Sequence, residues 1–229
     1  MQRHDYSRDW FGVIAPRDHH ADWLLAYTDE VADAAREGDW ARLLAVLDRA
    51  PMLLGSSVNG FRIGETSCIT PMHQAAWHGA DPSVVKELLR RGAWTVIPDA
   101  EGRLPVDMAR ERGHEHLLDV MTPTFRNHFR SSPEYTAALT AHLAALVEEV
   151  AGPLLSAGSR FRHLDFRQFE EDAGVTKVWF PVGEMYGGFN IDLYKGRLHV
   201  ESWSRIADGA AEYHVVTPKG YVLVDQGFL

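Results

Sequence analysis

The sequence is poor in cysteine and lysine, and it has no long apolar run. Its only cysteine is Cys68, so a framework of disulfides within the chain is excluded, which fits a reducing compartment. The N-terminal stretch MQRHDYSRDW is charged and lacks the apolar core of a secretory signal. No window approaches the roughly 18 uncharged apolar residues of a transmembrane helix. We therefore predict a cytoplasmic protein without a membrane partner.

Positive charge is also scarce. The chain of 229 residues has 23 lysines and arginines against 32 acidic residues, a formal net charge of −9. Nucleic-acid binding depends on a cationic surface, so we expect no nucleic-acid partner. Apolar residues make up 45% of the chain, the ordinary fraction for a globular protein, and this predicts a packed core.

The first half of the chain contains a repeat. Residues 70–93 read TPMHQAAWHGADPSVVKELLRRGA, and residues 104–121 read LPVDMARERGHEHLLDVM. Matching positions lie 34 residues apart: Thr70 and Leu104, Pro71 and Pro105, Ala75 and Ala109, Gly79 and Gly113. A weaker copy begins at Ala34-Ala35 and continues through Gly38. Proline suits the first turn of a helix, and glycine suits its end, so each copy predicts a pair of helices that must stack on a neighbour.

These motifs resemble the ankyrin-repeat family, and TPMHQAA is a specific match to its signature. The resemblance covers residues 30–122 as about three repeats, and it implies a stack of helix pairs. It also implies that His73 holds the turn by hydrogen bonding to Thr70. The sequence departs from the family in the long connection 53–69, in Pro82, and in Asp107 at the usual histidine position. Cys68, just before the turn, is expected to be a small buried residue. We expect the apolar residues 1–29 to cap one end of the stack.

The second half has a different pattern. Residues 123–132 are polar and predict a linker, and residues 133–229 predict an α+β domain with an antiparallel sheet. Ser132 and Pro133 predict a helix start, and an apolar stripe at helical spacing follows up to Gly152-Pro153. From Lys177 onward, segments rich in branched and aromatic residues alternate with turn residues, which predicts four or five strands. WFPVGEMYGGF and ESWSRI are similar to C-terminal parts of bacterial ankyrin-repeat proteins, a likeness that suggests no mechanism. The predicted fold class is therefore α+β: an N-terminal helical stack plus a helix packed on an antiparallel sheet.

A tight turn at Lys195-Gly196 predicts the register of one hairpin. Counting outward from that turn, Asp192 lies opposite His199 and Asn190 lies opposite Glu201. One face of this hairpin is then apolar and can cover the predicted helix, while the other is polar. A second hairpin around Pro218-Lys219-Gly220 would bring His214 beside Val224.

The polar sheet face is the place where an enzyme site is conceivable. Asp192 could orient the imidazole of His199, and Glu201 and His214 would complete a set of acid–base or metal-ligand type. However, one face of an antiparallel sheet is commonly solvated, and cross-strand charge pairs stabilise it without any chemistry. The sequence has no nucleophile elbow, phosphate loop or paired CxxC. We therefore predict no cofactor and no metal, and we leave open whether the protein is an enzyme.

The repeat resemblance supplies a second candidate surface. In ankyrin-type stacks, the outward positions of the first helices line a binding groove. Aligned across the copies, these positions give Gln74, Trp77, His78, Met108, Glu111 and Arg112 as partner-binding residues. Trp77 at the centre, rimmed by charges, is typical of an interface hot spot. The alternative is that the connection 53–69 covers Trp77.

Two functional hypotheses follow. In the first, the protein is an adaptor whose repeats bind a protein partner, and the α+β domain is an accessory. In the second, an enzyme or small-ligand site lies on the C-terminal sheet, and the repeats serve for docking. The sequence does not indicate an oligomeric state.

Overall fold

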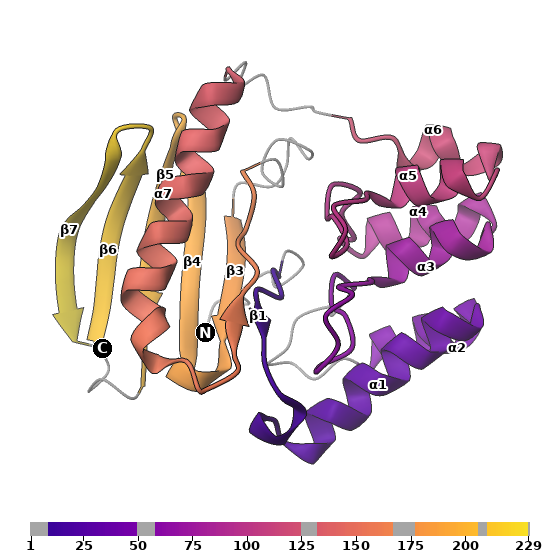
Figure 1. The fold of residues 1–229 in the computed structure, drawn as a ribbon, viewed down its shortest axis with the longest axis horizontal. Coiled ribbons are helices and arrows are strands. Elements are labelled where there is room, and N and C mark those ends of the chain that lie inside the picture. The colour runs from indigo at the N-terminus through magenta and orange to yellow at the C-terminus, as the bar shows by residue number, and fades with distance from the viewer. Residues whose placement is uncertain (1–8, 50–57, 125–131, 167–176, 206–209, 229) are drawn as a thin grey trace. The chain divides into compact units, whose positions relative to one another are not determined.

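The computed structural model describes residues 9–49, 58–124, 132–166, 177–205 and 210–228. The fold combines helices with an antiparallel sheet, so the α+β class is confirmed (Figure 1). The chain forms two compact units. Residues 14–124 belong to the first, and residues 10–13 join the C-terminal part from residue 125 onward in the second. Most of the predicted linker 123–132 lies outside the described residues, as do residues 1–8 of the N-terminal extension and residues 53–57 of the long connection.

The first unit consists of helix pairs. Helices α1 (Asp22–Glu37) and α2 (Trp40–Asp48) form one pair, and α3 (Pro71–His78) and α4 (Pro82–Arg90) form the next. Helix α5 (Pro105–Glu111) is followed by the 3-10 turn η3 (Glu115–Leu117) and the short helix α6 (Leu118–Met121). Helix α3 packs between α1 and α5. A short 3-10 turn, η2 (Arg17–His19), precedes α1.

The first helices of the second and third copies begin where the sequence predicts. Helices α3 and α5 start at Pro71 and Pro105, because proline lacks the N–H that a first turn leaves unpaired. Helix α3 ends at Gly79, whose φ of 62° is open to glycine at little steric cost. The predicted role of His73 is confirmed: its Nδ1 lies 3.2 Å from the Thr70 nitrogen and 2.9 Å from the Thr70 hydroxyl.

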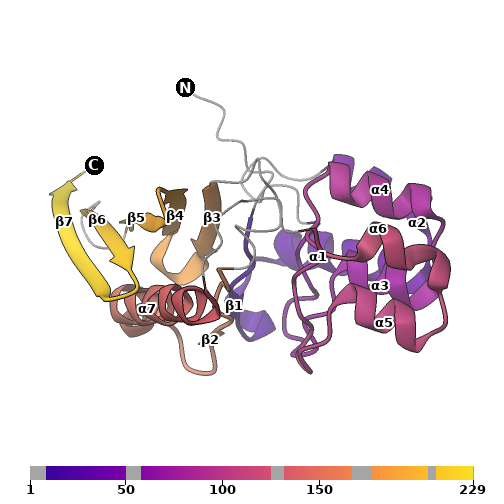
Figure 2. The ribbon, with the colours of Figure 1, turned by 90° about the horizontal axis from the view of Figure 1, so that it is seen from above.

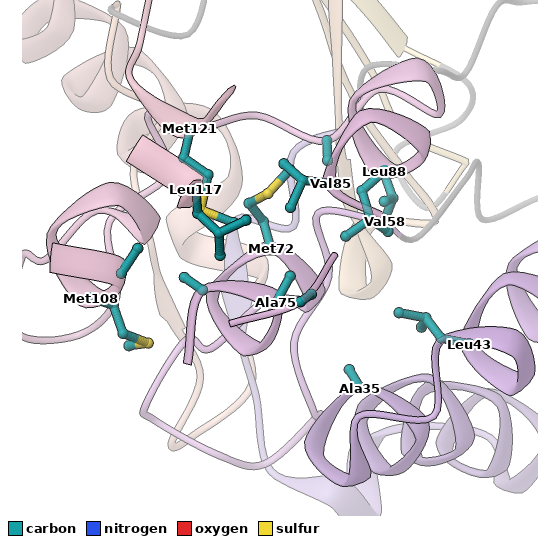
Figure 3. Packing of buried hydrophobic residues seen from close by; sticks show 14 of the residues in the cluster. Ala35, Leu43, Val58, Met72, Ala75, Val85, Leu88, Met108, Leu117 and Met121 are labelled. Carbon is teal, nitrogen blue, oxygen red and sulfur yellow. The ribbon is translucent and has the colours of Figure 1, made fainter. Parts of the chain in front are cut away.

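The core of the first unit is continuous from α1 to α6. Small residues such as Ala35 and Ala75 are fully buried and let neighbouring helices approach closely. Larger apolar side chains fill the space between the helix pairs, among them Leu43, Met72, Leu88, Leu117 and Met121 (Figure 3). Because one helix pair cannot bury its own apolar stripe, this shared core holds the stack together.

The second unit packs one long helix on a sheet. Helix α7 (Pro133–Ala151) starts at the predicted Ser132 cap and runs into the 3-10 turn η4 (Gly152–Leu154). The sheet is a five-stranded antiparallel meander of β3 (Lys177–Val182), β4 (Gly187–Tyr194), β5 (Arg197–Trp203), β6 (Ala210–Thr217) and β7 (Gly220–Phe228). A 3-10 turn, η5 (Gly183–Met185), links β3 to β4. Helix α7 lies along one face of the sheet (Figures 1 and 2).

The predicted register of β4 and β5 is confirmed at every pair, including Asp192 opposite His199 and Asn190 opposite Glu201. The prediction for the next hairpin is wrong by one residue, since His214 pairs with Leu223 and not with Val224. The turn holds only Pro218 and Lys219 between the paired residues Thr217 and Gly220. Val224 is the extra residue of a bulge that follows this pair.

Residues 10–13 belong to the second unit, although we expected the N-terminal extension to cap the helical stack. The Trp10 backbone N–H donates to the carbonyl of Trp179 in β3 (2.8 Å), and the Trp10 indole N–H donates to the carbonyl of Arg162 (2.8 Å). The Arg162 N–H donates to the carbonyl of Gly12. These bonds place a segment of the chain beside β3, one of the two edge strands of the sheet. The two-residue strands β1 (Val13–Ile14) and β2 (Arg160–Phe161) pair next to it.

Candidate functional site

Trp77, the residue that we placed at the centre of a partner surface, is exposed on the first unit. It lies in the last turn of α3, and 44% of it is accessible to solvent. The described part of the long connection, residues 58–69, therefore does not cover it. Instead, Asn59 of that connection is buried and bonds to the backbone of Gly92 and Trp94. The part of the connection that the structure describes thus closes over another side of the stack.

Arg112 lies against Trp77. It caps the C-terminus of α5, and its guanidinium carbon is 3.9 Å from the centroid of the Trp77 indole. At this distance the cation is attracted to the π face, and a planar guanidinium stacks on an indole better than an ammonium does. The contact joins two neighbouring helix pairs of the stack at the surface. It presents an apolar ring and a positive charge side by side.

The charge of Arg112 is not neutralised within the first unit. Every other arginine of residues 14–49 and 58–124 forms an ion pair with a carboxylate. Within those same residues, Arg112 forms none. Surface ion pairs contribute little to stability, so this difference between Arg112 and the other arginines has little effect on folding.

Of the other predicted partner residues, Gln74, Glu111 and His78 reach the surface of the first unit, whereas Met108 does not. Gln74 is half-buried one turn before Trp77, and Glu111 is exposed beside Arg112, 3.9 Å from the Arg103 guanidinium. His78 is exposed, but its Nε2 bonds to the carbonyl of Arg36 at 2.8 Å. The prediction for Met108 is wrong.

Met108 is only 4% exposed and belongs to the core of the first unit (Figure 3). The repeat alignment placed it in the same row as Gln74 on the outer positions of the helices. Its thioether side chain is apolar and flexible, so it turns inward to fill the core, where the polar Gln74 does not. Position in a repeat determines where the backbone of a residue lies, but it does not determine the direction of the side chain.

The sequence analysis did not predict that His114 contacts the backbone of Trp77. His114 Nε2 lies 3.2 Å from the backbone carbonyl of Trp77, and His116 Nε2 lies 3.3 Å from that of Gly79. His78 bonds to the preceding helix pair in the same way. The signal was available, because His78 and His114 recur at nearly the spacing of the repeat. These imidazoles satisfy carbonyls at helix ends, which have no partner inside the helix.

One smaller prediction on the first unit also has an outcome. Cys68 is buried, as expected, and its thiol lies 3.5 Å from the carbonyl of Thr66. Asp18 is largely exposed, and its carboxylate lies 3.9 Å from His19 Nε2. Within the described residues, no group of three or more potential ligands could hold a metal ion.

The alternative site on the sheet does not form as predicted. Asp192, His199 and Glu201 share the face of the sheet opposite α7, but His214 is paired with Val200 and lies on the face that packs toward α7. His214 is 6% exposed, and its ring meets Tyr221 edge-on. Since neighbouring strands pair residues of the same face, the register alone separates His214 from the other three.

The remaining residues of that set are engaged elsewhere. His199 Nδ1 bonds to the hydroxyl of Tyr213 (2.5 Å) and not to Asp192, which lies 3.6 Å from the ammonium of Lys177. Glu201 is exposed and accepts a long hydrogen bond from Asn190 (3.4 Å). The four predicted catalytic residues therefore do not converge.

The face of the sheet away from α7 carries an indole pair that the sequence did not predict. Trp179 of β3 and Trp203 of β5 stack with their centroids 5.7 Å apart, and both lie above β4. Gly188 of β4 is paired with Trp203, and a Cβ there would come within 2.8 Å of the Trp179 ring. Glycine at this position therefore leaves room for the Trp179 ring.

The sequence matches no model of a known protein family. Within the described residues, no helix is both long and apolar enough to cross a membrane. Among the described residues of the first unit, Trp77 and Arg112 combine an exposed aromatic ring with a cation that has no ion pair there.

Proposed function

We propose that this protein is an ankyrin-repeat adaptor that binds a protein partner through Trp77 and Arg112. The helix pairs, the helix starts at Pro71 and Pro105, and the bonds of His73 support the repeat assignment. The second unit then serves as an accessory domain.

The observation that carries the proposal is the stacked pair itself. An exposed indole next to an arginine that forms no ion pair within the described residues has the composition of an interface hot spot, where tryptophan and arginine predominate. A carboxylate is the partner group that fits this guanidinium best, because two parallel N–H donors of the guanidinium match the two carboxylate oxygens. The partner segment is therefore acidic, with an apolar side chain beside the acid to cover the free part of Trp77.

His114 and Gln74 support this surface in different ways. His114 holds the backbone of Trp77 and so fixes the end of α3 on which the indole stands. Gln74 offers an amide one helical turn away from Trp77, and it can bond to the backbone of a partner segment. Trp77 and Gln74 lie on α3, whereas Arg112 is the C-cap residue of α5 and His114 directly precedes η3. A surface anchored at helix ends in this way loses little entropy when it binds.

The test is affinity capture with the full chain, followed by direct measurement of affinity for the captured partner. We expect Trp77→Ala and Arg112→Glu each to weaken binding by about 30-fold or more, the range of hot-spot residues. Arg112→Lys keeps the charge but not the planar stack, so it should give an intermediate loss.

Two control variants match these changes. Trp23→Ala removes another exposed tryptophan of the first unit, and Arg110→Ala removes an exposed arginine that is paired with Asp107. Both should bind like the wild type, and all variants should unfold at nearly the same temperature. Equal binding by wild type, Trp77→Ala and Arg112→Glu would refute the proposed surface.

A further inference from the structure

We propose that the protein forms a symmetric dimer in which β7 pairs antiparallel with β7 of a second copy, with the two-fold axis at Val222. The inference is independent of the proposed partner surface and concerns only the second unit. It rests on the free edge of the sheet, on the exposed side chains of β7, and on the placement of two charges around Val222.

The two edges of the sheet differ. At β3, the Trp10 backbone donates a hydrogen bond to Trp179, so a segment of the chain already occupies that edge. At β7, no described residue pairs with the outer side of the strand, and the strand forms the border of the unit in both views (Figures 1 and 2). A free edge offers a row of unpaired N–H and C=O groups that can accept another strand.

The side chains of β7 make this edge apolar. Val222 is 58% exposed, Leu223 46% and Val224 57%, so the exposed residues are consecutive and lie on both faces of the strand. Edge strands usually avoid self-pairing by lysine, proline, charge or a bulge within the strand. In β7 the only charged residue is Asp225, beyond the apolar triplet. The bulge at Val224 lies at the C-terminal end of that triplet, so residues 220–223 remain in regular register.

Antiparallel pairing about Val222 gives each exposed residue a suitable neighbour. Val222 then faces Val222 of the second copy, and Leu223 faces Tyr221 on the α7 side of the sheet. Val224 faces Gly220. These pairs keep residues of one face together, as a pleated sheet requires. An axis at Leu223 fails this condition, because the bulge would set Tyr221 of one face against Asp225 of the other.

Charge complementarity supports the same axis. Lys219 and Asp225 lie three residues before and three residues after Val222, so each Asp225 comes beside Lys219 of the other copy. Both are exposed, and neither forms an ion pair within the described residues. The dimer would contain this pair twice, once on each side of the axis. No other charged residue lies in β7 or in its turn, so no like charges meet.

The proposed pairing is limited to two copies of the chain. A two-fold axis uses the same edge of both copies, and the opposite edge at β3 is occupied by residues of the chain. Pairing therefore stops at a ten-stranded sheet of two copies and does not continue into a fibre. With the axis at Val222, residues 220–224 of the two β7 strands lie opposite one another, which is a pairing of roughly 17 Å at about 3.4 Å per residue.

The first measurement is the molar mass of the full chain in solution by light scattering and sedimentation over a range of concentrations. We expect a dimer. Val222→Lys places two like charges on the axis and should give a monomer with unchanged helix and sheet content. A wild type that is monomeric at all accessible concentrations overturns the proposal, as does a dimer that Val222→Lys leaves intact.

Charge reversal tests the register. Lys219→Glu and Asp225→Lys should each weaken the dimer by about tenfold, because each converts two attractive pairs into repulsive ones. The double variant should restore the wild-type dissociation constant. All three changes are at exposed positions, so folding is not at risk. Failure of the double variant to recover would overturn the axis at Val222.

Cross-linking supplies a second test of the register. In the dimer, the two copies of Val222 have Cβ atoms about 4.5–5.5 Å apart, and a small adjustment brings two cysteines there within disulfide distance. Val222→Cys should therefore form a disulfide dimer under mild oxidation, while the matched controls Leu223→Cys and Val224→Cys should not. The native Cys68 is buried and gives no cross-link in the wild type. A cross-link that is strongest at Leu223 or Val224 would overturn the axis. If a strand of another protein occupies β7, the wild type will be a monomer and Val222→Cys will not cross-link.

Discussion

His114 Nε2 lies 3.2 Å from the backbone carbonyl of Trp77, which places a histidine of one helix pair at the end of the helix of the pair before it. The carbonyl accepts the hydrogen bond, so Nε2 carries the proton and the imidazole needs no positive charge for this contact. His78 repeats the arrangement with the carbonyl of Arg36. The helix pairs are thus joined at the surface by polar contacts in addition to their shared core.

Removing this imidazole should destabilise the stack modestly. We expect His114→Ala to lower the free energy of unfolding by about 1 kcal/mol, the net worth of a typical hydrogen bond. It should also weaken partner binding less than Trp77→Ala does, because the indole remains present on a less rigid helix end. Urea unfolding and affinity measurements check both statements. Lys86→Ala on the exposed side of α4 is the control. A His114→Ala variant with wild-type stability would contradict the role of the bond.

The glycines that end the first helices should differ in their tolerance of a side chain. At Gly79, with a φ of 62°, a Cβ would lie 2.6 Å from the His114 ring. At Gly113, with a φ of 74°, no heavy atom of the residues that the structure describes lies within 4 Å of such a Cβ. We expect Gly113→Ala to cost about 1–2 kcal/mol from backbone strain alone, and Gly79→Ala to cost more because the imidazole must also move. Thermal unfolding of the two variants tests this order, and equal melting temperatures would count against it.

Met108 provides a test of its corrected position. Because its side chain is buried in the core, Met108→Ala should lower the free energy of unfolding by about 2–5 kcal/mol. Partner affinity of the folded variant should stay near that of the wild type. Gln74→Ala should show the opposite pattern, with little change in stability and a loss of affinity. If Met108→Ala is as stable as the wild type but binds the partner more weakly, Met108 is part of the binding surface and the corrected position is wrong.

Acid should weaken the first unit partly through Asp99. Burial raises the pKa of this carboxyl, but hydrogen bonds from the backbone N–H of Arg103, from its guanidinium and from the N–H of Glu101 lower it by more. The folded-state pKa therefore lies below the ordinary value of 3.8. A lowered pKa stabilises the fold fully at pH values above the unfolded-state pKa, and this contribution disappears as the pH falls through the folded-state pKa.

The change Asp99→Asn isolates this contribution. The variant should be less stable than the wild type at neutral pH, and the difference should shrink when unfolding is measured at about pH 3 or below. Other carboxylates with lowered pKa values, such as Asp29 beside Arg17, remain in both proteins and do not affect the comparison. A difference that is the same at both pH values would show that Asp99 acts through shape and not through charge.

Local signals in the sequence predicted much of the fold. Proline at Pro71, Pro105 and Pro133 marks helix starts because its missing N–H and fixed φ suit a first turn. The Lys195-Gly196 turn fixed the β4–β5 register because counting outward from a two-residue turn leaves no freedom. The same counting did not predict the β6–β7 register, because the sequence does not distinguish a two-residue turn with a bulge from a three-residue loop.

The candidate sites depended on more than local signals. The sequence by itself determined the residue types, the helix ends and the alternation along each strand, because these follow from the conformational limits of single residues and short turns. Only the tertiary structure decided that His214 lies on the α7 side of the sheet, that Met108 is buried in the core, and that Arg112 stacks on Trp77. Those outcomes depend on which groups far apart in the chain compete for the same space and the same charge, and no local pattern contains that competition.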